Sequence, residues 1–378
     1  MIKRHRIFYK LLYYPVLLFV TLKFGYTYTK AKNLPQKYIV LSNHNTDYDP
    51  LLVAVSFSQQ MYFVASEHIA RWKIAYKFLR YGFEPIVRYK GTVAASTVKD
   101  ILRKVKAGSN VCIFAEGNRS WDGVTGPILP STGKVIKTAR CGLVTYKISG
   151  GYFTTPRWGT SGVRRGFLHG EPVNVYTEEQ IAAMSVDEIN AIINRDLYED
   201  AYATQLAAPK PYKSKAPAEG MENLLFVCPE CGKMDTIATH GDTVECTECG
   251  MHFRYDEYGM LQDALFATVR DLSRWQENEV AKAVETGMVY TAKHGTLTQI
   301  AKHRETPVDQ GAVSLSKEAL VCGNTTIPMD EITDLAIHGK RGIVFSTPSA
   351  YYELIPDGNA LKFVLFYENH KQGVKIEV

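Results

Sequence analysis

The sequence lacks a strong excess of charge of either sign and lacks a hydrophobic run long enough to cross a membrane. Its 378 residues carry a formal net charge of +5, which is too small to predict a nucleic-acid partner without a local basic cluster. This small positive charge is compatible with an anionic lipid or a phosphate group as partner. The uncharged run at residues 11–22 is shorter than the roughly 20 residues that a transmembrane helix needs. With 46% hydrophobic and 22% charged residues, the chain has enough apolar material for more than one folded domain.

The N-terminal segment also lacks a signal-peptide cleavage site. No small-x-small pattern follows its apolar stretch, and Lys30 and Lys32 stand where the cleavage site would lie. Lys10 and Lys23 bracket the apolar run, and aromatic residues are dense around it. We therefore expect residues 1–32 to form an amphipathic helix at the cytoplasmic face of a membrane, as a peripheral or monotopic element. The alternative is an ordinary core helix.

The order of apolar runs indicates several domains. From about residue 38, short apolar runs alternate with longer mixed segments, which predicts an α/β domain with a mixed sheet flanked by helices. An amphipathic helical stretch that includes Leu265, Val269 and Leu272 precedes short runs such as ALVC, GIVFS, YYELI and LKFVLFY, which predict a small antiparallel β domain. We expect a membrane-interface segment at residues 1–32, an α/β domain at 33–206, a proline-containing linker at 207–222, a cysteine module at 223–259, and a helix plus β domain at 260–378.

The segment SNHNTDYDPLL places a histidine, amides and carboxylates between two apolar runs. YIVLSN is predicted to be a buried strand that ends at Asn43, and Asp49-Pro50 is predicted to start a helix with the aspartate as its cap. His44 then lies on the connecting turn, where Asp49 can orient the imidazole and stabilise its protonated form. Asp47, which is closer to His44 in the sequence, is an alternative partner for the imidazole. No Gly-x-Ser-x-Gly elbow occurs, so the hydroxyl that His44 activates is expected to belong to a substrate.

A second polar turn follows a buried apolar run at FAEGNRS. Gly117 in this turn permits close approach of the backbone to a ligand, and Arg119 offers a forked donor suited to phosphate. Another arginine, Arg88, follows the short apolar strand predicted at FEPIV. We expect both arginines and the His/Asp pair to converge on one pocket at the edge of the sheet.

These motifs resemble those of the glycerolipid acyltransferases, of the 1-acylglycerol-3-phosphate (lysophosphatidate) acyltransferase type. SNHNTDYD resembles the family's Asn-His-x4-Asp motif, GFEPIVR its second motif, and FAEGNRS its Phe-Pro-Glu-Gly-Thr-Arg-Ser motif. The motifs occur in the family's order, and the resemblance covers about residues 1–200. The sequence departs from the family pattern at Ala115 and Asn118, and its fourth motif is degraded, because GLVTYKIS contains no proline. These departures concern the choice of acceptor more than acyl transfer.

The resemblance implies that His44 is the general base on the acceptor hydroxyl and that Asp49 orients it. It implies substrate-binding roles for residues that bind the acceptor phosphate and shape the site, namely Asn43, Arg88, Glu116, Gly117, Asn118 and Arg119. The donor is then a thioester, acyl-CoA or acyl carrier protein, and the acceptor a lysophospholipid in the membrane, lysophosphatidate before others. Another lysophospholipid, glycerol 3-phosphate or a glycolipid stays open as acceptor, and so does a non-catalytic lipid-binding scaffold with a zinc ribbon.

The seven cysteines are an odd number and do not show the spacing of a secreted disulfide scaffold. Two Cys-x-x-Cys pairs, Cys228/Cys231 and Cys246/Cys249, instead form a zinc-ribbon pattern. Four thiolates fill the tetrahedral shell of zinc and leave no position for water, which predicts a structural ion; a redox dithiol is the alternative. Acidic residues outnumber basic ones in this module, so we expect no nucleic-acid partner.

The runs of the last hundred or so residues resemble, by strand number and by the segments GKRGIVFS and YYELI, a pleckstrin-homology or GRAM-like β domain. Such a domain could contact lipid, acyl carrier protein or a second subunit, or it could cover the catalytic domain. Its one basic cluster, at residues 338–341, is interpreted as a solvated turn.

Overall fold

The computed structural model describes residues 3–66, 69, 73–88, 95–301 and 304–375. The chain forms two compact units: the first contains most of residues 1–214, and the second contains most of residues 215–378 together with Trp158–Ser161. The boundary between the units falls inside the predicted linker. Tyr212 and Ala218 of that stretch are buried, so it packs against its neighbours over part of its length. The other domain limits remain predictions.

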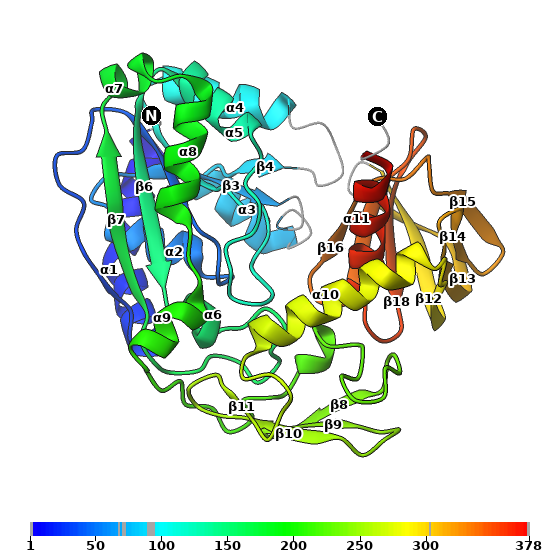
Figure 1. Cartoon of the computed structure of the whole chain (residues 1–378). Coiled ribbons are helices and arrows are strands. Elements are labelled where there is room, and N and C mark those ends of the chain that lie inside the picture. The colour runs from blue at the N-terminus through cyan, green and yellow to red at the C-terminus, as the bar shows by residue number, and fades with distance from the viewer. Residues whose placement is uncertain (1–2, 67–68, 70–72, 89–94, 302–303, 376–378) are drawn as a thin grey trace. The chain divides into compact units, whose positions relative to one another are not determined.

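The first unit is built on a seven-stranded mixed sheet, which confirms the predicted α/β class (Figure 1). The strand order is β1-β7-β6-β2-β5-β3-β4, and neighbouring strands are parallel except β6 and β7. Because β5, β2 and β6 are parallel neighbours, their C-terminal ends lie at one edge, with Ser42 opposite Phe114 and Tyr146. The strands are β1 (Thr27–Tyr28), β2 (Tyr38–Ser42), β3 (Met61–Ser66), β4 (Ile86–Arg88), β5 (Asn110–Phe114), β6 (Gly142–Ser149) and β7 (His169–Tyr176).

Helices cover both faces of this sheet and explain why β2 is buried along its whole length. Val40 of β2 belongs to a core cluster with residues of α1 and α2, whereas Ile39 and Leu41 belong to a second cluster with residues of α4, α5 and α8. A strand that is covered by helices on both faces has a continuous apolar sequence, as YIVLS does. The helices are α1 (Lys3–Phe24), α2 (Asp49–Ser56), α3 (Lys73–Gly82), α4 (Ala95–Lys106), α5 (Ser131–Ala139), α6 (Gly151–Thr154), α7 (Glu178–Ala183), α8 (Val186–Leu197) and α9 (Ala201–Ala207).

Helix α1 is longer than the uncharged run that the sequence shows. It spans 22 residues with Pro15 inside, and by length and composition alone it is long enough to cross a membrane. The expectation that it is too short to span, which rested on residues 11–22, is therefore not supported by the helix itself. Only 17% of its most apolar window is buried, which is little for a core helix. A signal sequence passes the same length test, so length does not decide what α1 does.

The second unit contains the cysteine module, a long helix and an antiparallel β domain. The module forms a four-stranded antiparallel sheet of β8 (Ile237–His240), β9 (Thr243–Cys246), β10 (His252–Tyr255) and β11 (Leu261–Gln262), preceded by a 3-10 turn at Met221–Asn223. The C-terminal sheet is seven-stranded, in the order β15-β14-β13-β12-β18-β17-β16. Its strands are β12 (Tyr290–Ala301), β13 (Arg304–Leu315), β14 (Ala319–Cys322), β15 (Thr325–Pro328), β16 (Thr333–His338), β17 (Gly342–Ser346) and β18 (Tyr351–Pro356).

Two helices of this unit differ from their sequence predictions. The run LKFVLFY, interpreted as a strand, begins helix α11 (Leu361–Lys375), in which Phe363 and Phe366 are both fully buried. Burial on several sides of one helix removes the alternation that separates helix from strand in a sequence. Helix α10 (Val269–Glu285) begins after Thr268, whose side chain accepts a hydrogen bond from the Asp271 N–H, so Leu265 lies outside it and is exposed.

Helix α10 is joined to the segment before the first cysteine pair by one buried side chain. The Oε1 atom of Gln276 accepts hydrogen bonds from the N–H groups of Phe226 and Val227, at 2.8 and 3.1 Å. Its Nε2 donates to the carbonyl of Leu224 at 3.0 Å. These contacts satisfy backbone groups that would otherwise be buried without partners.

Candidate active site and metal centre

The first motif lies at the C-terminal end of β2, where the chain turns into α2. Asp49 is the first residue of α2, and its side chain does not cap the helix as predicted. Instead it turns back toward the loop and is fully buried. Its Oδ2 accepts hydrogen bonds from His44 Nδ1 (2.8 Å), Asn45 N (2.7 Å) and Thr46 N (2.9 Å). Its Oδ1 accepts a fourth from Thr46 Oγ1 at 2.6 Å.

The pairing of His44 with Asp49 fixes the imidazole tautomer. An ionised carboxylate can only accept, so Nδ1 carries the hydrogen and Nε2 carries the lone pair. The ring also stacks on Phe114 at the end of β5, with centroids 4.7 Å apart. The His44 side chain is 21% exposed, whereas the Asp49 side chain is not exposed at all. Nε2 can therefore accept a proton from a substrate while Asp49 stabilises the imidazolium that results.

The rival partner of His44, Asp47, is engaged elsewhere. Arg119 Nη1 donates to Asp47 Oδ2 at 2.7 Å, and its Nε and Nη2 donate to the carbonyls of Asn45 (3.1 Å) and Thr155 (2.6 Å). An arginine has five N–H donors, so two of them have no partner in the described part of the chain. Arg157, which is buried, donates to the Arg119 carbonyl, and burial lowers the pKa of Arg157 to about 9.

Glu116 of the second motif forms a hydrogen bond with the backbone of the first motif. Its Oε1 accepts a hydrogen bond from the His44 N–H and its Oε2 accepts one from the Gly126 N–H, both at 2.8 Å. Burial raises the pKa of Glu116 to about 8. The two hydrogen bonds oppose this shift, whereas the nearby carboxylates Asp49 and Glu199 add to it. Glu116, predicted to bind substrate, is thus used to position the loop that carries His44.

The remaining residues of the second motif lie beside Arg88. Gly117 has a φ of +69°, a conformation that favours glycine, and a Cβ there would meet Arg88 Nη1 at 3.4 Å. The Nε of Arg88 is buried and has no hydrogen-bond partner in the part of the chain that the structure describes. Asn118 is partly buried between Gly117 and Arg119. The structure therefore brings Arg88, at the end of β4, to the turn that follows β5.

Asn43 is tied into the protein rather than left open. Its Oδ1 accepts a hydrogen bond from the Ile148 N–H, and both hydrogens of its Nδ2 are used, by the Ile148 carbonyl at 3.0 Å and by Glu199 Oε2 at 2.9 Å. Asn45 makes the same pair of contacts, at 3.1 and 3.0 Å. The Asn43 side chain, which was predicted to bind substrate, thus joins the end of β2 to β6.

Glu199 is a site residue that sequence reasoning missed. It lies between α8 and α9, it is buried, and it receives hydrogen bonds from the amides on both sides of His44. Burial raises its pKa to about 7. The sequence carries no local signal for this role, because Glu199 stands in no motif and its partners are more than 150 positions away.

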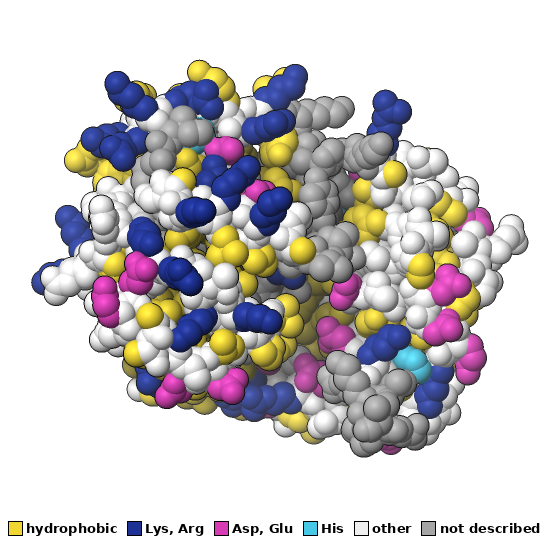
Figure 2. Space-filling model, turned by 90° about the horizontal axis from the view of Figure 1, so that it is seen from above, with side chains coloured by type: hydrophobic (Ala, Val, Ile, Leu, Met, Phe, Trp, Pro, Cys, Tyr) yellow, Lys and Arg dark blue, Asp and Glu magenta, His cyan; other side chains and the backbone are white. Residues whose placement is uncertain are grey.

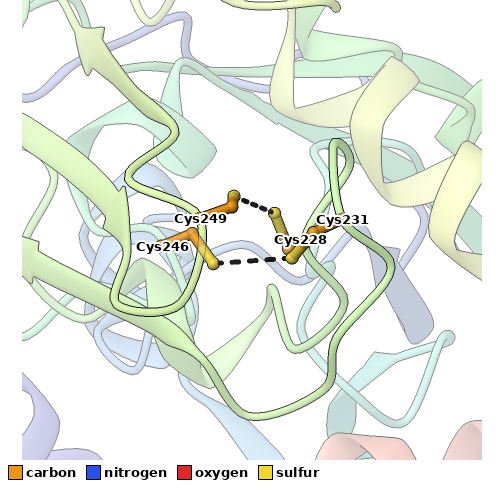
Figure 3. A group of neighbouring side chains, drawn as sticks. All are labelled: Cys228, Cys231, Cys246 and Cys249. Carbon is orange, nitrogen blue, oxygen red and sulfur yellow. Dashed lines mark hydrogen bonds between the residues drawn. The ribbon is translucent and has the colours of Figure 1, made fainter.

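The four predicted zinc ligands lie together in the second unit (Figure 3). Their sulfur atoms are all within 4.8 Å of one another, with Cys228 Sγ 3.7 Å from Cys249 Sγ and Cys231 Sγ 3.9 Å from Cys246 Sγ. A tetrahedral ion with metal–sulfur bonds of about 2.3 Å requires sulfur–sulfur separations of about 3.8 Å. These distances are too long for disulfides, and the group could hold one metal ion.

Comparison with known proteins concerns mainly the first unit. No curated protein matches the chain. Residues 25–149 match the family model described as Acyltransferase. Among solved structures, the chain is similar to the 1-acyl-sn-glycerophosphate (LPA) acyltransferase PlsC from Thermotoga maritima, at 16% identity and a TM-score of 0.39 over 55% of this chain and 79% of that one. It is also similar to the N-terminal PH domain of the human ARAP2 protein, at 11% identity and a TM-score of 0.18 over 24% of this chain and 81% of that one.

The raised pKa of Glu199 predicts a pH-dependent contribution to stability. Because the folded state keeps this proton up to about pH 7, well above the ordinary value of 4.5, the wild type loses stability as the pH rises between about 5 and 8. Glu199→Gln lacks that loss. Its melting temperature relative to wild type should therefore increase with pH over this range, and a difference of 1 kcal/mol corresponds to roughly 2 to 4 °C.

Thermal unfolding of both proteins at several pH values measures this trend. The matched control is Glu171→Gln, which removes an exposed carboxylate from β7. Parallel curves for wild type and Glu199→Gln would show that the Glu199 carboxyl does not ionise differently on folding.

Proposed function

We propose that the protein transfers a fatty acyl group from a thioester donor, acyl-CoA or acyl carrier protein, to the hydroxyl of a lysophospholipid at a membrane surface, since residues 25–149 match the family model described as Acyltransferase. We propose lysophosphatidate as the preferred acceptor and phosphatidate as the product. The observation that carries the proposal is the hydrogen bond between His44 Nδ1 and the buried Asp49, which leaves Nε2 as a base.

In the proposed reaction His44 acts as general base and then as general acid. Its Nε2 accepts the proton of the acceptor hydroxyl while that oxygen attacks the thioester carbonyl. The tetrahedral intermediate then collapses, the carbon–sulfur bond breaks, and the imidazolium returns the proton to the departing thiolate. Asp49 stabilises the imidazolium between these steps. The products are an ester and a free thiol, so the proton balance closes without another group.

Cationic residues near the imidazole support a phosphate-bearing acceptor. Among the described residues, the buried Nε of Arg88 has no hydrogen-bond partner, and two of the five N–H donors of Arg119 make no contact. Gly117 lets the backbone come close to a bound group, and Asn118 lies beside it. We propose that these residues bind the acceptor phosphate and that Asn43 and Glu116 keep the loop of His44 in place.

The N-terminal helix supports action at a membrane. Helix α1 is apolar over a long window and mostly unburied, and several of its large apolar side chains, including Leu11 and Leu18, are exposed. We propose that α1 lies in the interface on the cytoplasmic side, within a first segment that ends near residue 32. Residues 33–206 would then form the acyltransferase domain, followed by the linker, the zinc ribbon at 223–259 and the helix plus β domain at 260–378.

We propose that Cys228, Cys231, Cys246 and Cys249 bind one structural zinc ion. Two of the sulfur separations, 3.7 and 3.9 Å, fit a tetrahedral thiolate shell, and four protein ligands leave no position for a reacting group. The zinc ion would link the two cysteine turns to each other, and it takes part in no step of acyl transfer.

Replacing His44 should strongly reduce turnover without unfolding the protein. We expect His44→Ala to lower kcat by roughly 100- to 10,000-fold, the usual contribution of a positioned base. The measurement is release of free thiol from acyl-CoA or acyl carrier protein by detergent-purified protein with lysolipid acceptors. His294→Ala, which changes an exposed histidine of the second unit, serves as the control. Equal rates for wild type and His44→Ala would remove the general base from the mechanism.

Replacing Arg88 should affect the phosphate of the acceptor. A charge-assisted hydrogen bond contributes roughly 1.5 to 3 kcal/mol, so Arg88→Ala should raise KM for lysophosphatidate about 10- to 100-fold. The same change should have little effect with a monoacylglycerol, which has no phosphate. Arg88→Lys should recover part of the loss, and Arg103→Ala, an exposed arginine of α4, is the matched control. Equal KM changes for both acceptors would place the phosphate elsewhere.

Metal analysis tests the zinc proposal directly. We expect one zinc ion per chain in protein purified without chelator, and we expect Cys231→Ser with Cys249→Ser to lose it. Cys322→Ala, which alters a cysteine of β14 outside the cluster, should retain the ion. A metal-free wild type whose cysteines oxidise reversibly in pairs would instead favour the redox dithiol.

A further inference from the structure

Helix α3 exposes an apolar face that the motifs do not explain. Ile74, Phe78 and Tyr81 follow one another at helical spacing and are 84%, 50% and 56% exposed. Soluble proteins seldom leave several large apolar side chains together on the surface without a binding purpose. Among the described residues, Phe8 and Arg4 of α1 contact Phe78 and Tyr81, yet about half of each of these two side chains stays exposed.

Helix α1 carries a second exposed apolar stripe. Its members share one side of the helix and are Ile7, Leu11, Tyr14, Leu18 and Leu22. The opposite side packs into the core through Tyr9, Val20 and Phe24. The helix thus has one face for the protein and one apolar face that the first unit leaves open.

The N-terminal end of α1 contacts α3 beside the two exposed stripes. The ring of Phe8 in α1 lies 5.8 Å from the rings of Phe78 and Tyr81 in α3. The guanidinium carbon of Arg4 lies 4.0 Å from the centroid of the Tyr81 ring, and Arg4 Nε donates to the Tyr81 carbonyl at 2.9 Å. The N-terminal end of α1 therefore adjoins the part of α3 that carries Phe78 and Tyr81, and these parts of the two helices form one surface.

Basic residues line an open cavity at the edge of this surface. The cavity is about 350 Å³ in volume and is lined by Arg4, Lys77, Arg80, Tyr81 and Glu84. Its one carboxylate, Glu84, is paired with Lys104 outside the cavity lining. Within the described part of the chain, Lys77 and Arg80 form no ion pair. The cavity therefore offers cationic donors without a matching negative charge.

We propose that this surface docks on an anionic phospholipid bilayer, with a lipid phosphate in the cavity of Arg4, Lys77 and Arg80. The apolar side chains of α1 and α3 then enter the acyl region beside the bound headgroup. The inference deepens the proposed membrane-surface function and rests on it. It adds α3 and a headgroup site to the N-terminal helix.

Charge complementarity favours a bilayer over a protein partner. An interfacial surface combines large apolar side chains with lysine and arginine at their margin, because the cations remain at headgroup level. Figure 2 shows lysine and arginine side chains interspersed with apolar ones over one face of the first unit. Each cation near an anionic surface strengthens binding by roughly fivefold, and this effect decreases with salt.

Co-sedimentation of the full-length protein with vesicles tests the proposal. The vesicles contain either phosphatidylcholine alone or phosphatidylcholine with one-third phosphatidylglycerol. Lys77→Gln with Arg80→Gln should weaken binding to the anionic vesicles at least tenfold and leave binding to neutral vesicles within twofold of wild type. Ile74→Ser with Phe78→Ser should weaken binding to both kinds. Unchanged melting temperatures verify that each variant is folded.

The matched control removes the same charge from another helix. Arg103→Gln with Lys106→Gln changes exposed cations of α4 and should leave binding within twofold of wild type. Equal losses for this control and for the Lys77/Arg80 variant would overturn the headgroup site, since general charge would then explain binding. Binding of inorganic phosphate by the cavity, with vesicle binding unaffected by the α3 variants, would also overturn it and indicate a small-anion site.

Turnover separates this inference from the proposed function. Wild-type protein that binds vesicles as described but turns over no acceptor would support the docking surface and contradict the acyl-transfer proposal. Wild-type protein that turns over lysolipid while all α3 variants bind vesicles normally would contradict the docking surface alone.

Discussion

The candidate site depends on one buried carboxylate. Asp49 is excluded from solvent, and a charge in such a place would cost several kcal/mol if it stayed unpaired. Hydrogen bonds from His44, Asn45 and Thr46 compensate that cost. They can form only if the chain turns back sharply between β2 and α2. The hydrogen bonds that compensate the buried charge therefore also fix the tautomer of the His44 imidazole, so the turn cannot form without orienting the ring.

Two further carboxylates brace this turn from elements distant in sequence. Glu116 holds the His44 N–H from the end of β5, and Glu199 holds the amides of Asn43 and Asn45 from the segment after α8. Burial raises the pKa of both groups, so the folded state carries an electrostatic cost around His44. Such a concentration of perturbed groups is typical of functional sites, where the rest of the fold maintains an arrangement that would not form alone. Here the two core clusters on either side of β2 supply that support.

How far apart two partners lie along the sequence decides whether their interaction could be predicted from it. The strand β2, the turn and the His44–Asp49 pair were predictable because their residues are within a few positions of one another. The pairing of Arg119 with Asp47 joins residues 72 positions apart, and no pattern marks it. The role of Glu199 was invisible for the same reason. The strand predicted at LKFVLFY failed differently: helix α11 is buried on several sides, so its residues show no period to distinguish helix from strand.

The second unit indicates why a metal in the ribbon would matter beyond the ribbon. Buried polar contacts tie the cysteine module to its neighbours: Gln276 of α10 satisfies the backbone before Cys228, and Lys362 of α11 bonds both Asp235 of the module and the Thr291 carbonyl of β12. If the cysteine turns opened, these buried donors and acceptors would lose their partners, at a cost of roughly 1 to 3 kcal/mol each. A zinc ion that closes the turns would thus stabilise α10 and the β domain as well. The ribbon then acts as the part of the second unit on which the packing of the others depends.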